Sequence, residues 1–290
     1  IDIIHSPEDA SLFVKLKNQK KIITVHDTIP FYFPNMFDFM TRYRYKILFS
    51  RTLKNSDKII ADSYNTKQDL IKHFKIPEKK IKVIHLAANE NYKQLKENEI
   101  NNIKQKYNLN YSFILYVGTL EVRKNISILL KSLYKLKKQG IKHKLVITGK
   151  KGWKYKSIFK IIEQLNLQKD VIFIGYVSDE DLPALYNAAD LFVYPSIYEG
   201  FGLPPLEAMQ CGTPVITSNT SSLPEVVGNA GIMIDPYDVV ELANNMHEVL
   251  VNVSLREELS KKGLERAKLF SWKKCAEEHL KIYEEVYNMK

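Results

Sequence analysis

Two glutamates separated by seven residues frame the stretch of this chain with the clearest chemical potential. Glu199 and Glu207 enclose the sequence GFGLPPL, which follows a strand-like run at 190–194 and precedes a predicted helix at 206–211. A strand, a glycine loop and a helix N-terminus in this order present N–H groups and a positive dipole end, which suit an anion such as phosphate. Because a carboxylate repels phosphate, we expect the two glutamates to hold hydroxyl groups of a sugar or a ribose.

A simpler interpretation of this loop is an ordinary helix start whose glutamate complements the helix dipole. Glycine loops before helices are common, so one such unit carries little information. Two glycines and two prolines between a pair of glutamates favour a ligand site. Gly200 and Gly202 let the backbone approach a ligand, and Pro205 suits a first helical turn.

The elements that must position this loop alternate between strand and helix patterns. The predicted strands span residues 1–5, 21–26, 58–63, 82–86, 113–118, 144–149, 171–175, 190–194, 213–217 and 231–234. The predicted helices span residues 36–54, 66–74, 125–137, 153–165, 179–188, 206–211, 223–227, 239–251, 255–270 and 272–287, with Ser63, Ser178 and Ser271 as N-caps. The polar residues 87–105 are the expected linker between two series.

Valine- and isoleucine-rich strands that alternate with helices are typical of parallel sheets buried on both faces. The sequence therefore predicts an α/β fold with two such units, the first incomplete. Ligands of open parallel sheets bind beyond the carboxyl ends of the strands. Those ends include Gly118–Thr119, Thr148–Gly149, Gly175–Tyr176 and the glutamate loop, which we expect to converge on one crevice facing the first unit.

Composition limits the classes of protein that fit. The chain has 290 residues, 45% of them apolar, and a formal net charge of +10. Residues 1–95 carry 17 basic and 10 acidic side chains, so this third holds +7 of the excess. Basic residues scattered among helices, without an aromatic-interleaved sheet motif, argue against a nucleic-acid binder. The two cysteines make a disulfide framework or a zinc site improbable, and no apolar run reaches the roughly 18 residues of a membrane span.

Several motifs in order resemble the retaining glycosyltransferases of family 4 (group 1), which have the GT-B fold. The sequence LYVGTLEVRKN at 115–125 resembles their phosphate loop, and EGFGLPPLE at 199–207 matches their E-x7-E motif. GTPV at 212–215, LPEV at 223–226 with Gly228, and VHD at 25–27 also match. The resemblance covers essentially the whole chain and is strongest from 113 to 236.

This resemblance implies two Rossmann-like parallel-sheet domains facing a cleft. The first, residues 1–95, is the acceptor-side domain and is partial at its N-terminus. The second, residues 96–271, binds the nucleotide sugar, and the helix at 272–290 crosses back to the first. The family's glycine-rich loop near the start of the first domain is absent, and the chain does not begin with Met. We therefore expect the natural protein to begin upstream of Ile1. A chain made without this N-terminal segment should bind nucleotide but turn over poorly.

The resemblance also implies a role for each site residue. Lys124 would lie on the diphosphate, with Gly118, Thr119 and Arg123 beside it. Glu207 would accept hydrogen bonds from the ribose hydroxyls. Glu199 and the backbone of Gly200, Phe201, Gly202 and Leu203 would hold the donor sugar and phosphate. Tyr176 and Val177 would line the base pocket, and His26 would reach the donor sugar. The catalytic candidates are thus His26, Glu199 and Lys124.

Alternatives remain for these residues. Arg123 and Lys124 precede a predicted helix, so both are also expected as solvated cations at a helix start. His26 fits an ordinary histidine at a strand end. Thr119 stands where many family members have Arg, so a second fixed cation is missing unless Arg123 compensates.

The predicted activity is retaining transfer of a hexose such as mannose from a GDP- or UDP-linked donor to an acceptor hydroxyl of a glycan or lipid-linked acceptor. No carboxylate is placed as a covalent nucleophile, so the family's front-face route is expected. Neither an Asp-x-Asp at a strand end nor a His/Cys cluster occurs, so we expect no cofactor and no essential metal. The rival interpretations are a sugar-nucleotide epimerase on the same architecture and a nucleotide-sugar-binding module without turnover.

The segment 41–58 alternates cations with apolar residues. Such a helix could dock on anionic lipid, which would place a cytoplasmic enzyme at the inner face of the membrane. Packing of the same helix on its own sheet explains the pattern equally well.

Overall fold

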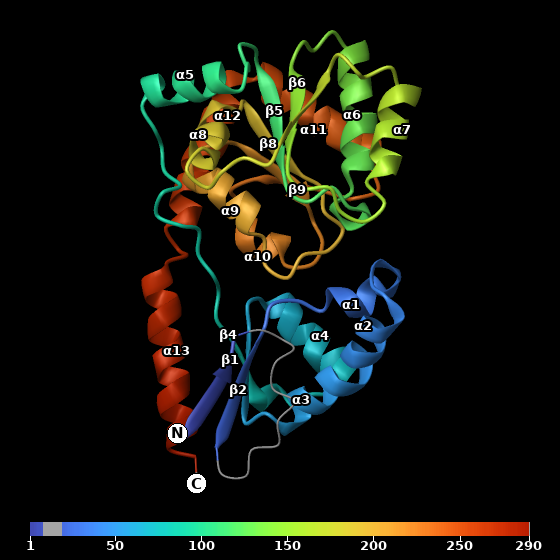
Figure 1. The fold of residues 1–290 in the computed structure, drawn as a ribbon. Helices are drawn as coiled ribbons and strands as arrows, with labels where there is room; N and C mark the ends of the chain where they lie inside the picture. The colour runs from blue at the N-terminus through green and yellow to red at the C-terminus, as the bar shows by residue number, and fades with distance from the viewer. Residues whose placement is uncertain (8–18, 290) are drawn as a thin grey trace. The chain divides into compact units, whose positions relative to one another are not determined.

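The computed structural model describes residues 1–7 and 19–289. The chain forms two compact units (Figure 1). Unit 1 comprises residues 1–87, 199–201 and 270–290, and unit 2 comprises residues 88–198 and 202–269. Each unit has its own parallel sheet, so the predicted α/β class with two sheets is confirmed.

Unit 1 is built on a four-stranded parallel sheet. The strand order is β1 (Ile3–Ser6), β2 (Lys20–Val25), β3 (Lys58–Ala61) and β4 (Ile81–Val83). In the register of β2 and β3, Val25 lies opposite Ala61. The residues that follow these two strands, His26 and Asp62, therefore leave the same edge of the sheet side by side.

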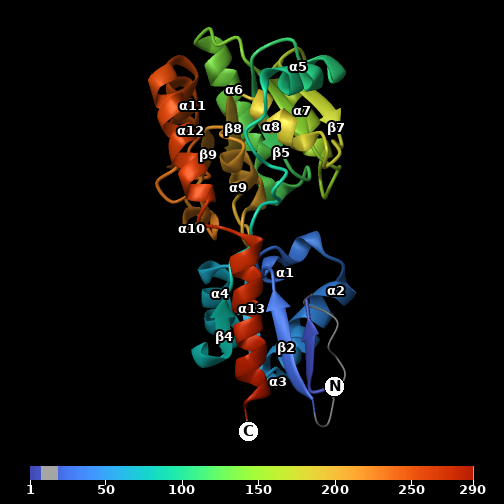
Figure 2. The ribbon, with the colours of Figure 1, turned by 90° about the vertical axis from the view of Figure 1, so that its left-hand side faces the viewer.

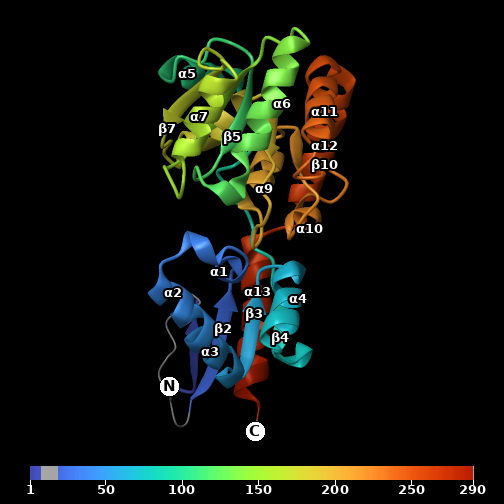
Figure 3. The same ribbon diagram turned by 90° about the vertical axis from the view of Figure 1, so that its right-hand side faces the viewer.

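Alternating side chains of these strands build a separate core on each face of the sheet. Ile23, Ile59 and Ala61 pack with residues of helices α3 (Ser50–Asn55) and α4 (Tyr64–Phe74). Ile22 and Ile60 point the other way and pack with Ile282 and Val286 of the last helix, α13 (Trp272–Tyr287). Figure 2 shows α13 lying across its face of the sheet, and Figure 3 shows the opposite face with α2, α3 and α4.

The predicted single helix at 36–54 is interrupted. The chain forms α1 (Ile29–Tyr32), a 3-10 turn (Pro34–Met36), α2 (Phe39–Arg44), a π-helical turn (Tyr45–Phe49) and α3. Helix α2 restarts because the Asp38 side chain accepts a hydrogen bond from the Thr41 N–H at 3.0 Å. Ser63 caps α4 through the Thr66 N–H, as predicted. Lys58, which the sequence placed both at the end of the basic segment 41–58 and at the start of a predicted strand, lies on β3, where it is buried and pairs with Glu285 at 2.5 Å.

Unit 2 contains a six-stranded parallel sheet. The strand order is β10 (Ile232–Ile234), β9 (Val215–Ser218), β8 (Leu191–Tyr194), β5 (Phe113–Val117), β6 (Lys144–Thr148) and β7 (Val171–Gly175). Helices α6 (Ile126–Lys138), α7 (Lys156–Gln164) and α11 (Val239–Val251) lie on one face (Figure 3). Helices α8 (Leu182–Ala188) and α9 (Leu203–Gln210) lie on the other (Figure 1), where α12 (Val253–Ala267) packs against α9.

Two boundaries in unit 2 differ from the sequence prediction. Part of the expected linker is helix α5 (Glu97–Lys106), whose first turn is closed by a hydrogen bond from the Lys96 N–H to Glu99 at 3.1 Å. The helix predicted at 179–188 begins three residues later, after a turn that Ser178 and Asp181 close.

Helix α9 also begins earlier than predicted, at Leu203 and not at Leu206. Pro204 and Pro205 both fit its first turn because their fixed φ is already helical. Glu207 consequently lies in the second turn, and the first turn of α9 holds no acidic residue. Dipole complementation at the very start of the helix therefore does not explain this glutamate.

Candidate functional site

The loops that follow β5 and β6 in unit 2 are joined by backbone hydrogen bonds. The Gly118 N–H donates to Thr148 at 3.0 Å, and the Leu120 N–H donates to Lys150 at 2.9 Å. Thr119 between them is exposed. The predicted phosphate loop is thus fixed against its neighbour, which gives Gly118 and Thr119 defined places at the carboxyl edge of the sheet.

Lys124 and Arg123 are not solvated surface cations, since each is only 8% exposed. The Lys124 ammonium group donates to the hydroxyl of Tyr194 and lies 4.9 Å from the centre of the same ring. Tyr194 ends β8 and stacks on Tyr116 of β5. A buried cation over a tyrosine ring is held in place before any ligand arrives, which is the property required of a group that stabilises a departing phosphate.

Arg123 makes hydrogen bonds within the protein. Its guanidinium donates to Glu121 at 2.6 Å and to the backbone carbonyl of Tyr198 at 2.8 Å, and its own carbonyl accepts from Ile197 at 2.9 Å. These bonds fix the chain just before Glu199. Arg123 therefore positions the glutamate loop. To replace the cation that many family members have at the position of Thr119, Arg123 would have to leave these partners.

The N-terminus of α9 offers fewer donors to an anion than its length suggests. Gly202 is the N-cap, with φ of +124°, a conformation that favours glycine. The next two positions after Leu203 are Pro204 and Pro205, which lack N–H groups. Of the four amides that a helix leaves unsatisfied at its start, those of Gly202 and Leu203 remain to meet a phosphate.

Glu207 is held by tyrosine hydroxyl groups. Tyr186, fully buried in α8, donates to Glu207 Oε2 at 2.9 Å, and Tyr92 also donates to this carboxylate. Burial raises the pKa of Glu207 to about 7, the Tyr186 bond acts in the opposite direction, and the charge of Asp179 raises the pKa further. A carboxylate has about four lone-pair sites, so one that accepts from two tyrosines can still accept from a diol.

Tyr176 and Val177 follow β7. The Tyr176 ring is exposed and carries the Lys150 ammonium group 5.5 Å from its centre, whereas Val177 is buried. An exposed aromatic ring at this edge can stack on a flat base. The sequence analysis does not predict four residues near these groups: Tyr186, Tyr92, Asp179 and Lys150. Tyr186 occurs in a segment with no polar pattern, and Tyr92 occurs in the expected linker.

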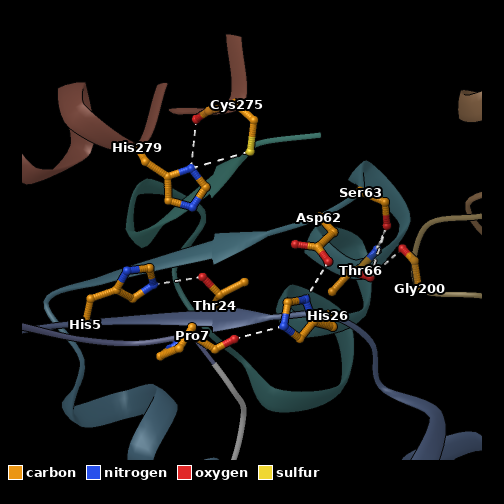
Figure 4. Close-up of polar contacts among 10 residues, drawn as sticks. All are labelled: His5, Pro7, Thr24, His26, Asp62, Ser63, Thr66, Gly200, Cys275 and His279. Carbon is orange, nitrogen blue, oxygen red and sulfur yellow. Dashed lines mark hydrogen bonds and ion pairs between the residues drawn. The ribbon is translucent and has the colours of Figure 1, made fainter. Parts of the chain in front are cut away.

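The remaining predicted residues belong to unit 1. His26 lies between two partners, with its Nδ1 2.6 Å from Asp62 Oδ2 and its Nε2 2.8 Å from the Pro7 carbonyl oxygen (Figure 4). Glu199, Gly200 and Phe201 group with this unit, and Glu199 is buried. The Gly200 carbonyl accepts from the Thr66 hydroxyl at 3.3 Å.

Gly200 is required by a neighbouring backbone. A Cβ at this position would lie 2.0 Å from the carbonyl oxygen of His26 and 2.7 Å from Cβ of Asp27. The sequence predicted that this glycine lets a ligand approach. The structure shows that its missing side chain makes room for the protein's own strand end.

The predicted site residues thus form two groups. Gly118, Thr119, Arg123, Lys124, Tyr176, Val177, Gly202, Leu203 and Glu207 lie in unit 2, and His26, Glu199, Gly200 and Phe201 lie in unit 1. Within residues 1–7 and 19–289, no three His, Cys, Asp or Glu side chains gather as a metal site. In the same part of the chain, no helix is long and apolar enough to cross a membrane.

Comparison with known families identifies this arrangement. The sequence profile of Glycosyl transferases group 1 matches residues 97–266, and that of Glycosyltransferase Family 4 matches residues 1–91. The chain belongs to the group 1 glycosyl transferases. The resemblance seen in the E-x7-E and phosphate-loop motifs is therefore confirmed, and the chain is a glycosyltransferase.

Relatives within this family include O-antigen chain mannosyltransferase B of Escherichia coli, 37% identical over 97% of this chain and 74% of the relative. The Escherichia coli serotype-specific mannosyltransferase WbdA is 33% identical over 91% of this chain, which spans 33% of WbdA.

Solved structures share the fold. A glycosyltransferase from Rickettsia africae aligns with a TM-score of 0.81 and 23% identity over 100% of this chain and 78% of its own. HepE of Anabaena, solved with UDP and glucose, aligns with a TM-score of 0.78 and 22% identity over 92% of this chain and 72% of its own. The two parallel-sheet units of this chain, together with its alignment on these structures, confirm the predicted GT-B class.

Proposed function

We propose that this glycosyltransferase moves a mannosyl residue, with retention of configuration, from a nucleoside-diphosphate donor to a hydroxyl group of a growing polysaccharide. The mannosyltransferases among its relatives, one of which acts on the O-antigen chain, support mannose and an O-antigen type of glycan as acceptor. The structural neighbour solved with UDP supports a nucleotide donor. The donor panel described below distinguishes GDP from UDP.

One observation carries this proposal. Unit 2 holds a buried cation and a partly buried carboxylate that are each held by a tyrosine, Lys124 by Tyr194 and Glu207 by Tyr186. A fixed cation suits a diphosphate, and a fixed carboxylate suits the two hydroxyl groups of a ribose. These are the two chemically distinct parts that every nucleoside-diphosphate donor has in common.

The chemistry that follows is a substitution at the anomeric carbon. The bond from this carbon to the diphosphate oxygen breaks, the acceptor oxygen bonds to the same face, and the acceptor proton passes to the departing phosphate. Lys124 and the amides of Gly202 and Leu203 stabilise the negative charge that the leaving group gains. Glu199 and His26 hold the donor sugar, and no covalent intermediate with the protein is required.

The experiment is a panel of GDP- and UDP-linked hexoses, incubated with the full chain and a mannose-terminated acceptor. We expect one donor to yield a longer glycan and free nucleotide in equal amounts, with the anomeric configuration of the donor kept in the product. An inverted linkage would contradict the retaining mechanism. Nucleotide binding without product from any donor would favour the non-catalytic module.

The epimerase alternative predicts a different dependence on acceptor. An epimerase converts its nucleotide sugar without an acceptor, whereas a transferase releases nucleotide only when the acceptor is present. Activity retained in a chelator would support the predicted independence from metal. Complete loss of transfer, restored by a divalent ion, would overturn it.

The surface of helix α2 supports a second proposal, contact with an anionic membrane from the cytoplasmic side. Phe39, Met40 and Tyr43 are 74%, 54% and 52% exposed on this helix. Arg42 and Lys46 are exposed beside them, and no acidic residue occurs between Asp38 and Asp57. Exposed aromatic and apolar groups next to cations suit the interface of an anionic bilayer.

Vesicle sedimentation tests this surface. We expect the chain to partition onto vesicles that contain anionic lipid and much less onto neutral ones. Serine at Phe39, Met40 and Tyr43 together should abolish the difference, whereas serine at Val251 and Val253, exposed apolar residues of unit 2, should not. Equal partitioning of the wild type onto both kinds of vesicle would exclude the proposed docking.

A further inference from the structure

Three adjacent strands of unit 1 bring the surroundings of His26 together. Pro7 follows β1, His26 follows β2 and Asp62 follows β3. Because the sheet is parallel, these residues leave it at one edge. Figure 4 shows the imidazole ring of His26 between the Asp62 carboxyl group and the Pro7 carbonyl.

Both partners of the ring can only accept when Asp62 is ionised. The Asp62 oxygen lies 2.6 Å from Nδ1, and the Pro7 carbonyl oxygen lies 2.8 Å from Nε2. A neutral imidazole carries one N–H and would leave one of these contacts unmade. The geometry therefore fits the imidazolium form of His26, in which both nitrogens donate.

Burial separates the two members of the pair. The side chain of Asp62 is 3% exposed, whereas that of His26 is 48% exposed. Asp62 also precedes Ser63, which caps α4, so its backbone is fixed between a strand and a helix. A buried carboxylate that is anchored in this way holds the inner nitrogen of the ring, and the outer nitrogen remains at the accessible edge.

We propose that Asp62 is the positioning residue through which His26 acts on the donor sugar. Asp62 keeps Nδ1 protonated and the ring oriented, so that the Nε2 N–H donates to an oxygen atom of the sugar. This N–H faces the Pro7 carbonyl oxygen in the structure, and the sugar oxygen takes the place of that carbonyl. This inference rests on the proposed function, since it assumes that a donor sugar reaches His26.

The test compares isosteric changes at two buried carboxyl groups of unit 1. Asp62→Asn leaves an acceptor for Nδ1 but removes the negative charge. Asp69→Asn is the matched control, because Asp69 is also buried and accepts hydrogen bonds from Thr28 and Tyr32. We expect Asp62→Asn to lower kcat about tenfold to a hundredfold, with KM for the donor and the Kd of free nucleotide changed less than about threefold.

A spectroscopic readout separates positioning from simple damage to the fold. In the full chain labelled with 15N-histidine, both ring nitrogens of His26, assigned by their loss in His26→Gln, should show protonated shifts. Asp62→Asn should shift one of them toward the unprotonated value, and Asp69→Asn should change neither.

Each outcome bears on the proposal. Transfer at the wild-type rate in Asp62→Asn overturns it and leaves the proposed glycosyl transfer intact. Equal losses in the two variants also overturn it, because a structural effect would then suffice. If the wild type transfers no sugar at all, the proposed function fails, and the ring shifts still decide whether Asp62 sets the state of His26.

Discussion

At the scale of single residues, burial and partners decide which charged groups can meet a ligand. Lys124 and Arg123 are neighbours with equal exposure but different partners. The Arg123 guanidinium donates to Glu121 and to the Tyr198 carbonyl, whereas the Lys124 ammonium group donates to the Tyr194 hydroxyl. A phosphate can replace a hydroxyl as the partner of an ammonium group more readily than it can displace two separate protein acceptors from a guanidinium group.

Replacement of Lys124 by Gln should therefore separate phosphate from nucleoside. We expect the affinity for the donor's nucleoside diphosphate to fall about tenfold to a hundredfold, because a charge-assisted hydrogen bond is lost. The affinity for the bare nucleoside should stay within about twofold. Calorimetry measures both, and Lys58→Gln, a change at a buried lysine of unit 1, is the control. Equal losses for nucleoside and diphosphate would place Lys124 away from the phosphates.

Glu207 should make nucleotide binding depend on pH. The pKa of this carboxyl group is raised to about 7 by burial, so below pH 7 the ribose meets a protonated group. We expect the ratio of wild-type affinity to Glu207→Gln affinity to fall as pH drops from about 8 to about 6. Titration of the phosphates affects both proteins and cancels in the ratio. A ratio that does not change with pH would contradict the assigned role.

The same shift has a consequence for stability. Unfolded Glu207 ionises near 4.5 and the folded group near 7, so between these values the folded state holds more protons. The free energy of unfolding contributed by Glu207 should therefore decrease as pH rises through this window. Denaturant titrations of the wild type and Glu207→Gln should converge at low pH and separate above pH 7, with the wild type less stable.

The positions of several candidate residues were predictable from residue type and spacing. His26 follows a strand, Lys124 precedes a helix and Glu199 lies in a glycine loop, and the sequence shows all three features. Their partners were not predictable. Tyr186 appears in an apolar helical pattern, and its contact with Glu207 arises only when α8 and α9 pack side by side. Asp62 could have been found, because it follows its strand as His26 follows the neighbouring one.

At the scale of elements, the last helix belongs to the core of unit 1. Ile282 of α13 is buried among Ile22, Ile60 and Ile84, although it lies more than two hundred positions from Ile22 and Ile60 in the sequence. Ile282→Ala should lower the free energy of unfolding of unit 1 by about 2–5 kcal/mol, since it removes buried methyl groups and leaves a cavity.

Leu280 on the same helix provides the control for this change. Its side chain is exposed, so Leu280→Ala should alter the free energy of unfolding by less than about 0.5 kcal/mol. Urea titration of both variants gives the comparison. Equal effects of the two substitutions would mean that α13 does not pack on the sheet as described.

Helix boundaries were the least predictable feature of the fold. The sequence predicts a linker where helix α5 forms, because the polar residues there show little periodicity and Ile103 is the one buried residue of this helix. The break between α1 and α3 depends on Pro34 and on the Asp38 cap, local signals within a pattern that looks like one helix. Val- and Ile-rich strands were easier, because burial on both faces leaves a strong composition signal.

At the scale of the whole molecule, the chain has two units with separate cores, and we expect the nucleotide to bind to unit 2. Trp153 lies in unit 2 and Trp272 in unit 1, and the chain has no other tryptophan. Trp272→Phe and Trp153→Phe therefore each leave a fluorescence probe for one unit. Free nucleotide at about a hundred times its Kd should stabilise the unit that binds it by about 2.7 kcal/mol.

We expect that stabilisation in the protein that retains Trp153. The unfolding midpoint reported by Trp272 should move much less, because the residues assigned to base, ribose and diphosphate all belong to unit 2. A larger shift in the Trp272 signal would assign the nucleotide to unit 1 and contradict the division of the site.

The two glutamates of the E-x7-E motif offer the most direct test of this division. Glu207 is bound to Tyr186 in unit 2, whereas Glu199 groups with unit 1. The measurement is the Kd of free nucleoside diphosphate, by calorimetry, for the wild type, Glu207→Ala and Glu199→Ala. We predict an affinity loss of about tenfold or more in Glu207→Ala and less than about twofold in Glu199→Ala, which should instead lose sugar transfer. Equal losses of nucleotide affinity in both variants would contradict separate roles for the ribose and the donor sugar.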